Sequence, residues 1–132
     1  MILLDTHALF WLATGDKKLG RACRARIDQA LAADKLAVSA ISFWELAMLA
    51  SKKRIEASDI EEMRRIALES GIAELPLDGP MAILAAQLDS DHKDPADRFI
   101  AATALRHRAT LVTADERLLA GLPGLTLQDA RL

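Results

Sequence analysis

Short apolar runs alternate with stretches of helical periodicity along the whole chain. Most apolar runs are three or four residues long, as buried strands are, and the intervening stretches repeat their apolar positions every three to four residues, as helices do. The predicted strands are residues 2–4, 36–39, 72–75, 110–113 and, at an edge, 125–127. The predicted helices are residues 6–13, 21–33, 41–54, one opened by residues 58–61 and ending near 71, then 79–88, 95–108 and 116–120.

Polar residues mark the start of two of these helices. Ser58 and Glu61 have the spacing of a capping box, in which each side chain satisfies a backbone N–H of the first turn. Asp94 followed by Pro95 is typical of an N-cap with proline at the first helical position, and residues 89–94 form a polar loop before it. These signals place helix starts more firmly than periodicity alone.

The order of the elements predicts the fold class. Short strands that are apolar on both faces and separated by helices are typical of a parallel sheet covered on both sides. We therefore predict an α/β fold: a three-layer α/β/α sandwich with a central, mainly parallel sheet of four to five strands. The 132 residues fit one domain and contain no linker-like stretch, so we expect a single domain spanning residues 1–132.

Composition indicates the class of protein and the cellular compartment that we expect. Hydrophobic residues make up 52% and charged residues 27%, as in a compact globular domain. One cysteine cannot form an internal disulfide, which suits a reducing cytosol. No apolar run approaches the ~20 residues that span a bilayer, and the first residues lack the features of a signal peptide. We therefore expect a cytoplasmic protein that does not enter a membrane.

Charge does not by itself point to nucleic acid. The formal net charge is −2, so there is no overall attraction to a polyanion. Any chemistry on nucleic acid must therefore come from a local patch or from a bound metal ion.

Four acidic residues occupy positions that topology brings together. Asp5 directly follows the first predicted strand, and Asp115 comes just past the fourth, so both lie at the carboxyl edge where parallel sheets bind ligands. Glu45 lies early in a helix that begins at that edge. Asp97 lies in the first turn of the helix that feeds the fourth strand, which begins at the same edge. The sequence thus predicts four carboxylates on one rim.

Each of these acids also has a local structural interpretation. Asp5 and Asp115 are common turn formers at strand ends, and Asp97 would interact favourably with a helix dipole. Ser42 and Glu45 match a capping box, which would make Glu45 a helix-start residue. Separate local roles, however, do not require that all four side chains converge.

Clustered carboxylates need a positive charge to offset their repulsion. Divalent cations supply it well, and a site made only of oxygen ligands suits Mg²⁺ or Mn²⁺. Such an ion lowers the pKa of a bound water and stabilises charge on a phosphodiester. We therefore predict that Asp5, Glu45, Asp97 and Asp115 are metal ligands and catalytic residues, with Mg²⁺ as the cofactor and Mn²⁺ as a possible substitute.

Four segments, in order along the chain, resemble PIN-domain proteins, and most of all the VapC toxins of bacterial toxin–antitoxin pairs. The segments are Leu4-Asp5-Thr6, Ser42-Phe43-Trp44-Glu45-Leu46, the run from His92 through Asp94-Pro95, Asp97-Arg98 and Ile100-Ala101-Ala102, and Leu111-Val112-Thr113-Ala114-Asp115. The resemblance covers essentially the whole chain. The family's four acidic positions correspond to Asp5, Glu45, Asp97 and Asp115, and Thr113 matches a hydroxyl position beside the last acid.

The resemblance implies a function and partners. It implies a Mg²⁺-dependent endoribonuclease that acts as a toxin, cuts RNA through a metal-activated water and inhibits growth or translation. It also implies a homodimer and a cognate antitoxin whose tail occupies a groove of the toxin. The RNA target does not follow from it.

Other functions remain open at this point. A receiver-type phosphoacceptor domain has a similar length and an acidic pocket, but it needs adjacent acids after the first strand and a late lysine, whereas Asp5 stands alone and no lysine follows Lys93. A phosphatase with an Asp-x-Asp pair is disfavoured because His7 stands two residues after Asp5. A catalytically silent binding module, or a PIN nuclease acting on another nucleic acid, is also possible.

A few further residues could serve the site or its partners. The Thr6 hydroxyl could orient Asp5, and Arg98 could contact a substrate phosphate or an acid. Four aromatic residues lie close in sequence to two of the acids: Phe10, Trp11, Phe43 and Trp44. They predict an apolar groove beside the acidic rim, and the nearly all-apolar helices that carry them suggest contact with another chain.

Overall fold

A computed structural model describes residues 1–56, 59–88 and 93–132. Five short strands form one sheet in the order β3-β2-β1-β4-β5, and every neighbouring pair is parallel. The strands are β1 (Ile2–Leu4), β2 (Leu36–Ser39), β3 (Ala73–Leu75), β4 (Thr110–Thr113) and β5 (Thr126–Asp129). The helices are α1 (Thr6–Thr14), α2 (Arg21–Ala32), α3 (Ile41–Ser51), α4 (Ile60–Glu69), α5 (Gly79–Gln87), α6 (Pro95–His107) and α7 (Glu116–Leu119).

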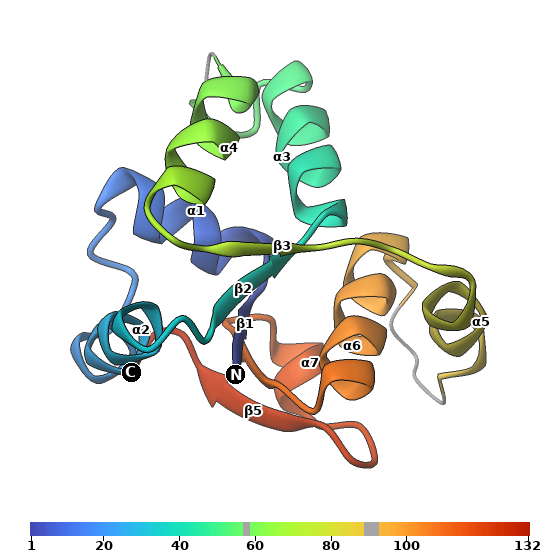
Figure 1. The fold of residues 1–132 in the computed structure, drawn as a ribbon. Coiled ribbons are helices and arrows are strands. Elements are labelled where there is room, and N and C mark those ends of the chain that lie inside the picture. The colour runs from blue at the N-terminus through green and yellow to red at the C-terminus, as the bar shows by residue number, and fades with distance from the viewer. Residues whose placement is uncertain (57–58, 89–92) are drawn as a thin grey trace.

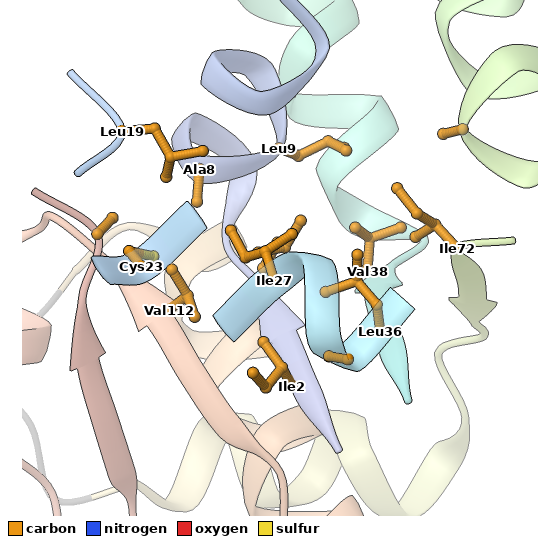
Figure 2. Close-up of a cluster of buried hydrophobic side chains, with 14 of the residues drawn as sticks. Ile2, Ala8, Leu9, Leu19, Cys23, Ile27, Leu36, Val38, Ile72 and Val112 are labelled. Carbon is orange, nitrogen blue, oxygen red and sulfur yellow. The ribbon is translucent and has the colours of Figure 1, made fainter. Parts of the chain in front are cut away.

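Helices cover both faces of the sheet (Figure 1). Because side chains alternate along a strand, Ile2 and Leu4 of β1 point to one face and Leu3 points to the other. The first face packs against α1 and α2 through Leu9 and Ile27, as Figure 2 shows, and the opposite face packs against α6. The predicted three-layer α/β/α sandwich with a parallel sheet is confirmed.

Small residues let α6 lie close to the sheet. Ala101 and Ala104 of α6 are essentially fully buried against Leu3 and Leu111, the central side chains of that face. Short side chains allow close approach of helix and strand. The N-terminus of α6, which carries Asp97, is therefore held next to the carboxyl edge of the sheet.

Most predicted boundaries agree with the structure to within one or two residues, and two differ for clear reasons. Helix α3 ends at Ser51 rather than 54, because Lys53 adopts a left-handed conformation (φ 55°) that stops the helix. Strand β5 extends to Asp129 rather than 127 because its backbone pairs with β4 up to Thr113. The backbone pairing continues through Gln128 and Asp129. Their side chains are polar, so a hydrophobic pattern does not predict that the strand includes them.

The N-caps of two helices can be compared with the capping residues predicted from the sequence. Asp94 is the N-cap of α6, with its carboxylate accepting a hydrogen bond from the Ala96 N–H (2.9 Å), as predicted. Helix α4 is capped by Asp59, which accepts from the Glu62 N–H (2.9 Å), while Ser58 of the predicted capping box lies outside the described residues. Within the described part of the chain, every helix is too short or too polar to cross a membrane.

Candidate metal centre

The four acids predicted from the sequence line one pocket of about 420 Å³ at the carboxyl edge of the sheet. Its described lining consists of Asp5, Thr6, His7, Trp11, Glu45, Asp94, Asp97, Ala114, Asp115 and Arg131. Two strand ends, the second turn of α3 and the first turn of α6 supply the acids, because crossovers of a parallel sheet bring these positions to one edge. Asp5, Glu45, Asp97 and Asp115 therefore lie where topology places them.

Asp5 is the most firmly held of these acids. It is 4% exposed and directly follows β1. One carboxylate oxygen accepts from the Ala8 N–H (2.8 Å), which makes Asp5 the N-cap of α1, and the other accepts from the Thr113 hydroxyl (2.5 Å). Burial raises the pKa of Asp5 to about 6, even though both hydrogen bonds favour its charged form.

The pKa of Asp97 is raised well above its ordinary value by burial and by repulsion. Burial raises its pKa first, and the negative charges of four neighbouring acids raise it further, to about 8: Asp94, Glu45, Asp115 and Asp5. Burial also raises the pKa of Glu45, and the charges of Asp94 and Asp115 act in the same direction. The pocket therefore disfavours negative charge when no cation is present.

Three of these carboxylates are close enough to share an ion. One oxygen each of Glu45, Asp94 and Asp97 lie within 4.8 Å of one another. The donor set is entirely carboxylate oxygen, which is the ligand type that Mg²⁺ and Mn²⁺ prefer. The residues present therefore fit a hard divalent cation.

Thr113 connects the two acids that follow strands. Its hydroxyl donates to Asp5 and accepts from the Asp115 N–H (3.0 Å). Asp115 in turn caps α7, accepting from the Arg117 N–H (2.8 Å) and the Leu118 N–H (3.1 Å). The turn after β4 is thereby fixed relative to the turn after β1.

The capping-box interpretation of Ser42 and Glu45 is wrong. Glu45 does not begin a helix: the N-cap of α3 is Ala40, and Ser42 is buried within the helix, where its hydroxyl oxygen accepts from the Thr6 hydroxyl (3.3 Å). Thr6 thus orients α1 against α3 and lines the pocket as well. The Arg98 guanidinium donates to the carbonyls of Ala85 and Leu88 (both 2.9 Å) at the end of α5. His92 lies outside the described residues.

Sequence reasoning did not assign Asp94, Arg131, His7 or Ala114 to the pocket, and it placed Trp11 in a groove beside it. Asp94 was assigned only a capping role, yet it also lies beside Glu45 and Asp97. Trp11 reaches the pocket because it lies on α1 one turn after His7, a spacing that the sequence does show. Arg131 comes from the chain segment after β5, and no local signal points to it.

Comparisons with known proteins agree on the family. The PIN domain model matches residues 2–121. Ribonuclease VapC22 of Mycobacterium tuberculosis is 37% identical over 118 residues, which cover 89% of this chain and 88% of that protein. The chain is thus similar to a ribonuclease over nearly its full described length.

Solved structures show the same fold. A toxin-antitoxin complex from Klebsiella pneumoniae matches with a TM-score of 0.66 and 28% identity, covering 98% of both chains. VapBC2 from Rickettsia felis, bound to a DNA fragment from its promoter, matches with a TM-score of 0.71 and 19% identity over 97% of this chain and 98% of that chain. From the acidic pocket, the parallel sheet and these matches together, we conclude that the chain belongs to the PIN domain family.

Proposed function

We propose that this protein is a metal-dependent endoribonuclease that acts as the toxin of a toxin–antitoxin pair. The observation that carries the proposal is the gathering of Asp5, Glu45, Asp97 and Asp115 in one pocket. Similarity to a ribonuclease and to toxin–antitoxin structures supports it. The receiver-type alternative is not favoured, because the described lining of the pocket contains no lysine.

We further propose that the ion is Mg²⁺, with Mn²⁺ as a substitute, and that these four acids are the catalytic and metal-binding residues. Glu45 and Asp97 would hold the ion together with Asp5 and Asp115, and Asp94 is near enough to assist. When bound, the ion supplies a water of lowered pKa and positive charge toward the phosphodiester.

The chain's own residues prepare the site for this chemistry. Thr113 fixes the orientation of the Asp5 carboxylate, and the buried Thr6 ties α1 to α3, which carries Glu45. Because these contacts are made within the protein, the carboxylates need little rearrangement when a cation binds. Preorganisation of this kind distinguishes a metal site from a merely acidic surface.

Mg²⁺ should be required for RNA cleavage by the purified protein. We expect single-stranded RNA to be cut in Mg²⁺ or Mn²⁺, to be spared in excess EDTA, and to be cut again when the metal is restored. A parallel preparation of Asp97→Asn controls for contaminating nucleases, since a contaminant would be unaffected by that change. Cleavage that continues unchanged in excess EDTA would contradict the proposed metal dependence.

An antitoxin partner is part of the proposal, and a second, apolar groove offers it a surface. This groove, of about 570 Å³, lies between α1 and α4. Its apolar lining consists of Leu9, Leu12, Ala13, Leu31, Met63, Ile66, Ala67 and Ile72, and its polar lining of Glu56, Asp59, Glu62 and Ser70. A partner segment with aliphatic anchors and basic residues would complement it.

The expected aromatic groove is wrong in its composition. Trp11 lines the acidic pocket, whereas Phe10 and Phe43 are half-buried against the core and Trp44 is exposed. Within the described residues, the apolar groove is lined by aliphatic side chains instead. Helix α1 lies between the two hollows, with Leu9 and Leu12 on the groove and Trp11 on the acidic pocket.

Ile66→Glu should weaken binding of the cognate antitoxin at least roughly tenfold without changing RNA cleavage, because it places a charge in the apolar groove. Ile83→Glu is a matched control: Ile83 on α5 is 60% exposed and Ile66 is 54% exposed, but only Ile66 lines the groove. Titration calorimetry against both variants measures the effect. Equal affinities for the two would place the antitoxin elsewhere.

We also propose that the protein forms a homodimer in the cytoplasm. Trp44 on α3 supports the dimer, because it leaves half of a large apolar side chain exposed on a helix with few polar residues.

A further inference from the structure

Arg131 lines the acidic pocket, and its described ion pairs are made with two other acids. Among the described residues that line the pocket, it is the only arginine or lysine, and five carboxylates line the pocket with it. Its guanidinium instead contacts two carboxylates, those of Asp129 and Glu116, which are not among the described lining residues.

These two acids fix the orientation of the guanidinium. Asp129 accepts from Nε (3.0 Å) and from Nη2 (2.8 Å), which is a two-point contact in the plane of the group, and Glu116 accepts from Nη1 (2.8 Å). An arginine has five N–H donors, so these described contacts use three of them. The side chain is 45% exposed, so a ligand can reach it.

Backbone hydrogen bonds fix the residues on both sides of Arg131. The Ala130 N–H donates to the Thr113 carbonyl (2.8 Å), and the Ala130 carbonyl accepts from the Gly20 N–H (2.8 Å). The Leu132 carbonyl accepts from two N–H groups in the first turn of α2, those of Ala22 (3.0 Å) and Cys23 (3.2 Å).

Gly20 makes this close approach possible. A Cβ at position 20 would lie 2.1 Å from the Leu132 carbonyl carbon and 2.5 Å from the carbonyl atoms of Arg131, so any other residue would displace the segment. Thr113 belongs to the same arrangement, since its hydroxyl holds Asp5 and its carbonyl holds Ala130. Arg131 is thus built into the frame that positions Asp5.

Electrostatics explains what an arginine held in this way can do. A phosphate that approaches five carboxylates is repelled except where a cation faces it. If Arg131 paired with the pocket acids, it would compete with a metal ion for them. Asp129 and Glu116 engage the guanidinium in place of those acids, while Arg131 still lines the pocket. Exposed ion pairs add little to stability, so orientation is the larger consequence of these contacts.

We propose that Arg131 is a substrate-binding residue that donates hydrogen bonds to a backbone phosphate of RNA at the acidic pocket, an inference that rests on the proposed ribonuclease function. Asp129 and Glu116 are positioning residues that act through Arg131.

The kinetic test compares Arg131→Gln with Arg117→Gln. Arg117 is an exposed arginine on α7 and is not among the described residues lining the pocket, so it is a matched control for loss of one positive charge. We expect Arg131→Gln to lower kcat/KM by roughly 10- to 100-fold, mainly through KM, and Arg131→Lys to lower it less because it keeps the charge but loses the planar fork. Melting temperatures of the variants should stay within a few degrees of the wild type.

A binding test does not depend on cleavage. In an Asp97→Asn background, which keeps RNA intact, Arg131→Gln should weaken RNA binding in Mg²⁺ and reduce the slope of log K against log[salt] by about one, whereas Arg117→Gln should not. Fluorescence anisotropy with labelled single-stranded RNA measures both.

The outcomes separate the two proposals. Equal RNA affinities and equal salt slopes for the two glutamine variants would overturn the role of Arg131, even if the wild type cleaves RNA. Absence of metal-dependent cleavage by the wild type would overturn the proposed function, while the binding comparison would still decide whether Arg131 contacts RNA.

Discussion

Asp97→Asn is expected to abolish RNA cleavage and at the same time to stabilise the metal-free protein. The loss of activity should be roughly 10³-fold or more, because one carboxylate ligand of the ion is removed and the transition state loses several kcal/mol of stabilisation. The gain in stability follows from burial of the charge and from repulsion: burial first, and then four neighbouring acids, raise the pKa of Asp97 to about 8. Removing that charge should stabilise the folded state by about 2 kcal/mol at pH 7, after allowance for partial exposure.

The pH dependence of stability provides a sharper test of the same idea. Asp97 binds its proton more tightly in the folded protein than in the unfolded chain, where the pKa is near 3.8. Its ionisation therefore lowers the stability of the folded state as pH rises from about 4 to about 8, and has no further effect above that range. Asp5, with its pKa raised to about 6, contributes to the lower part of this range.

Thermal melts in EDTA across this range measure the effect. Wild-type stability should fall up to about pH 8, whereas Asp97→Asn should lack the part of this fall that Asp97 causes and should lose less stability in total. Added Mg²⁺ should reduce the wild-type decrease, because a bound cation favours the ionised acids. A melting temperature that drops sharply in the variant would instead mean that Asp97 serves the fold.

Asp5→Asn and Asp5→Ala are both expected to abolish cleavage, but the alanine variant should be about 2 kcal/mol less stable than the asparagine variant. Both changes remove the charge, so their difference isolates the hydrogen bonds of this position. Asparagine can still accept from the Ala8 N–H and pair with the Thr113 hydroxyl. Alanine removes the N-cap of α1 and leaves a buried hydroxyl without its partner.

Denaturant unfolding of the two Asp5 variants, compared at one pH in EDTA, measures this difference. The wild type cannot serve as the reference, because its buried charge adds a pH-dependent penalty of its own. Equal unfolding free energies for the two variants would mean that the contacts of Asp5 with Ala8 and Thr113 contribute nothing to the fold.

The contacts of Asp5 and Asp97 are only partly predictable from the residues next to them in the sequence. Asp5 follows a strand and precedes a helix, so its capping role could be anticipated from position alone. Its bond to Thr113 joins residues 108 positions apart, and it exists because β1 and β4 are neighbours in the sheet. For Asp97, the sequence indicates a first-turn position and a rim shared with Asp5, Glu45 and Asp115, but not the nearby charge of Asp94.

The bounds of helices and strands are likewise predictable only where they depend on adjacent residues. Asp94 and Pro95 start α6 because capping depends only on adjacent residues. The end of α3 at Ser51 and the extent of β5 were not predictable in this way. The first depends on a left-handed turn at Lys53 that no glycine signals, and the second on backbone pairing with β4.

By itself, the sequence determined the α/β class, the order of strands and helices, and the placement of Asp5, Glu45, Asp97 and Asp115 at one edge. Hydrophobic period and capping residues are local properties, and parallel crossovers bring strand ends to one side whatever the details of packing. Only the tertiary structure decided that Asp94 joins the acidic cluster and that Arg131 stands beside it. Those contacts depend on the order β3-β2-β1-β4-β5 and on the close passage of Arg131 and Leu132 against Gly20, which bring together residues with no local relation in the chain.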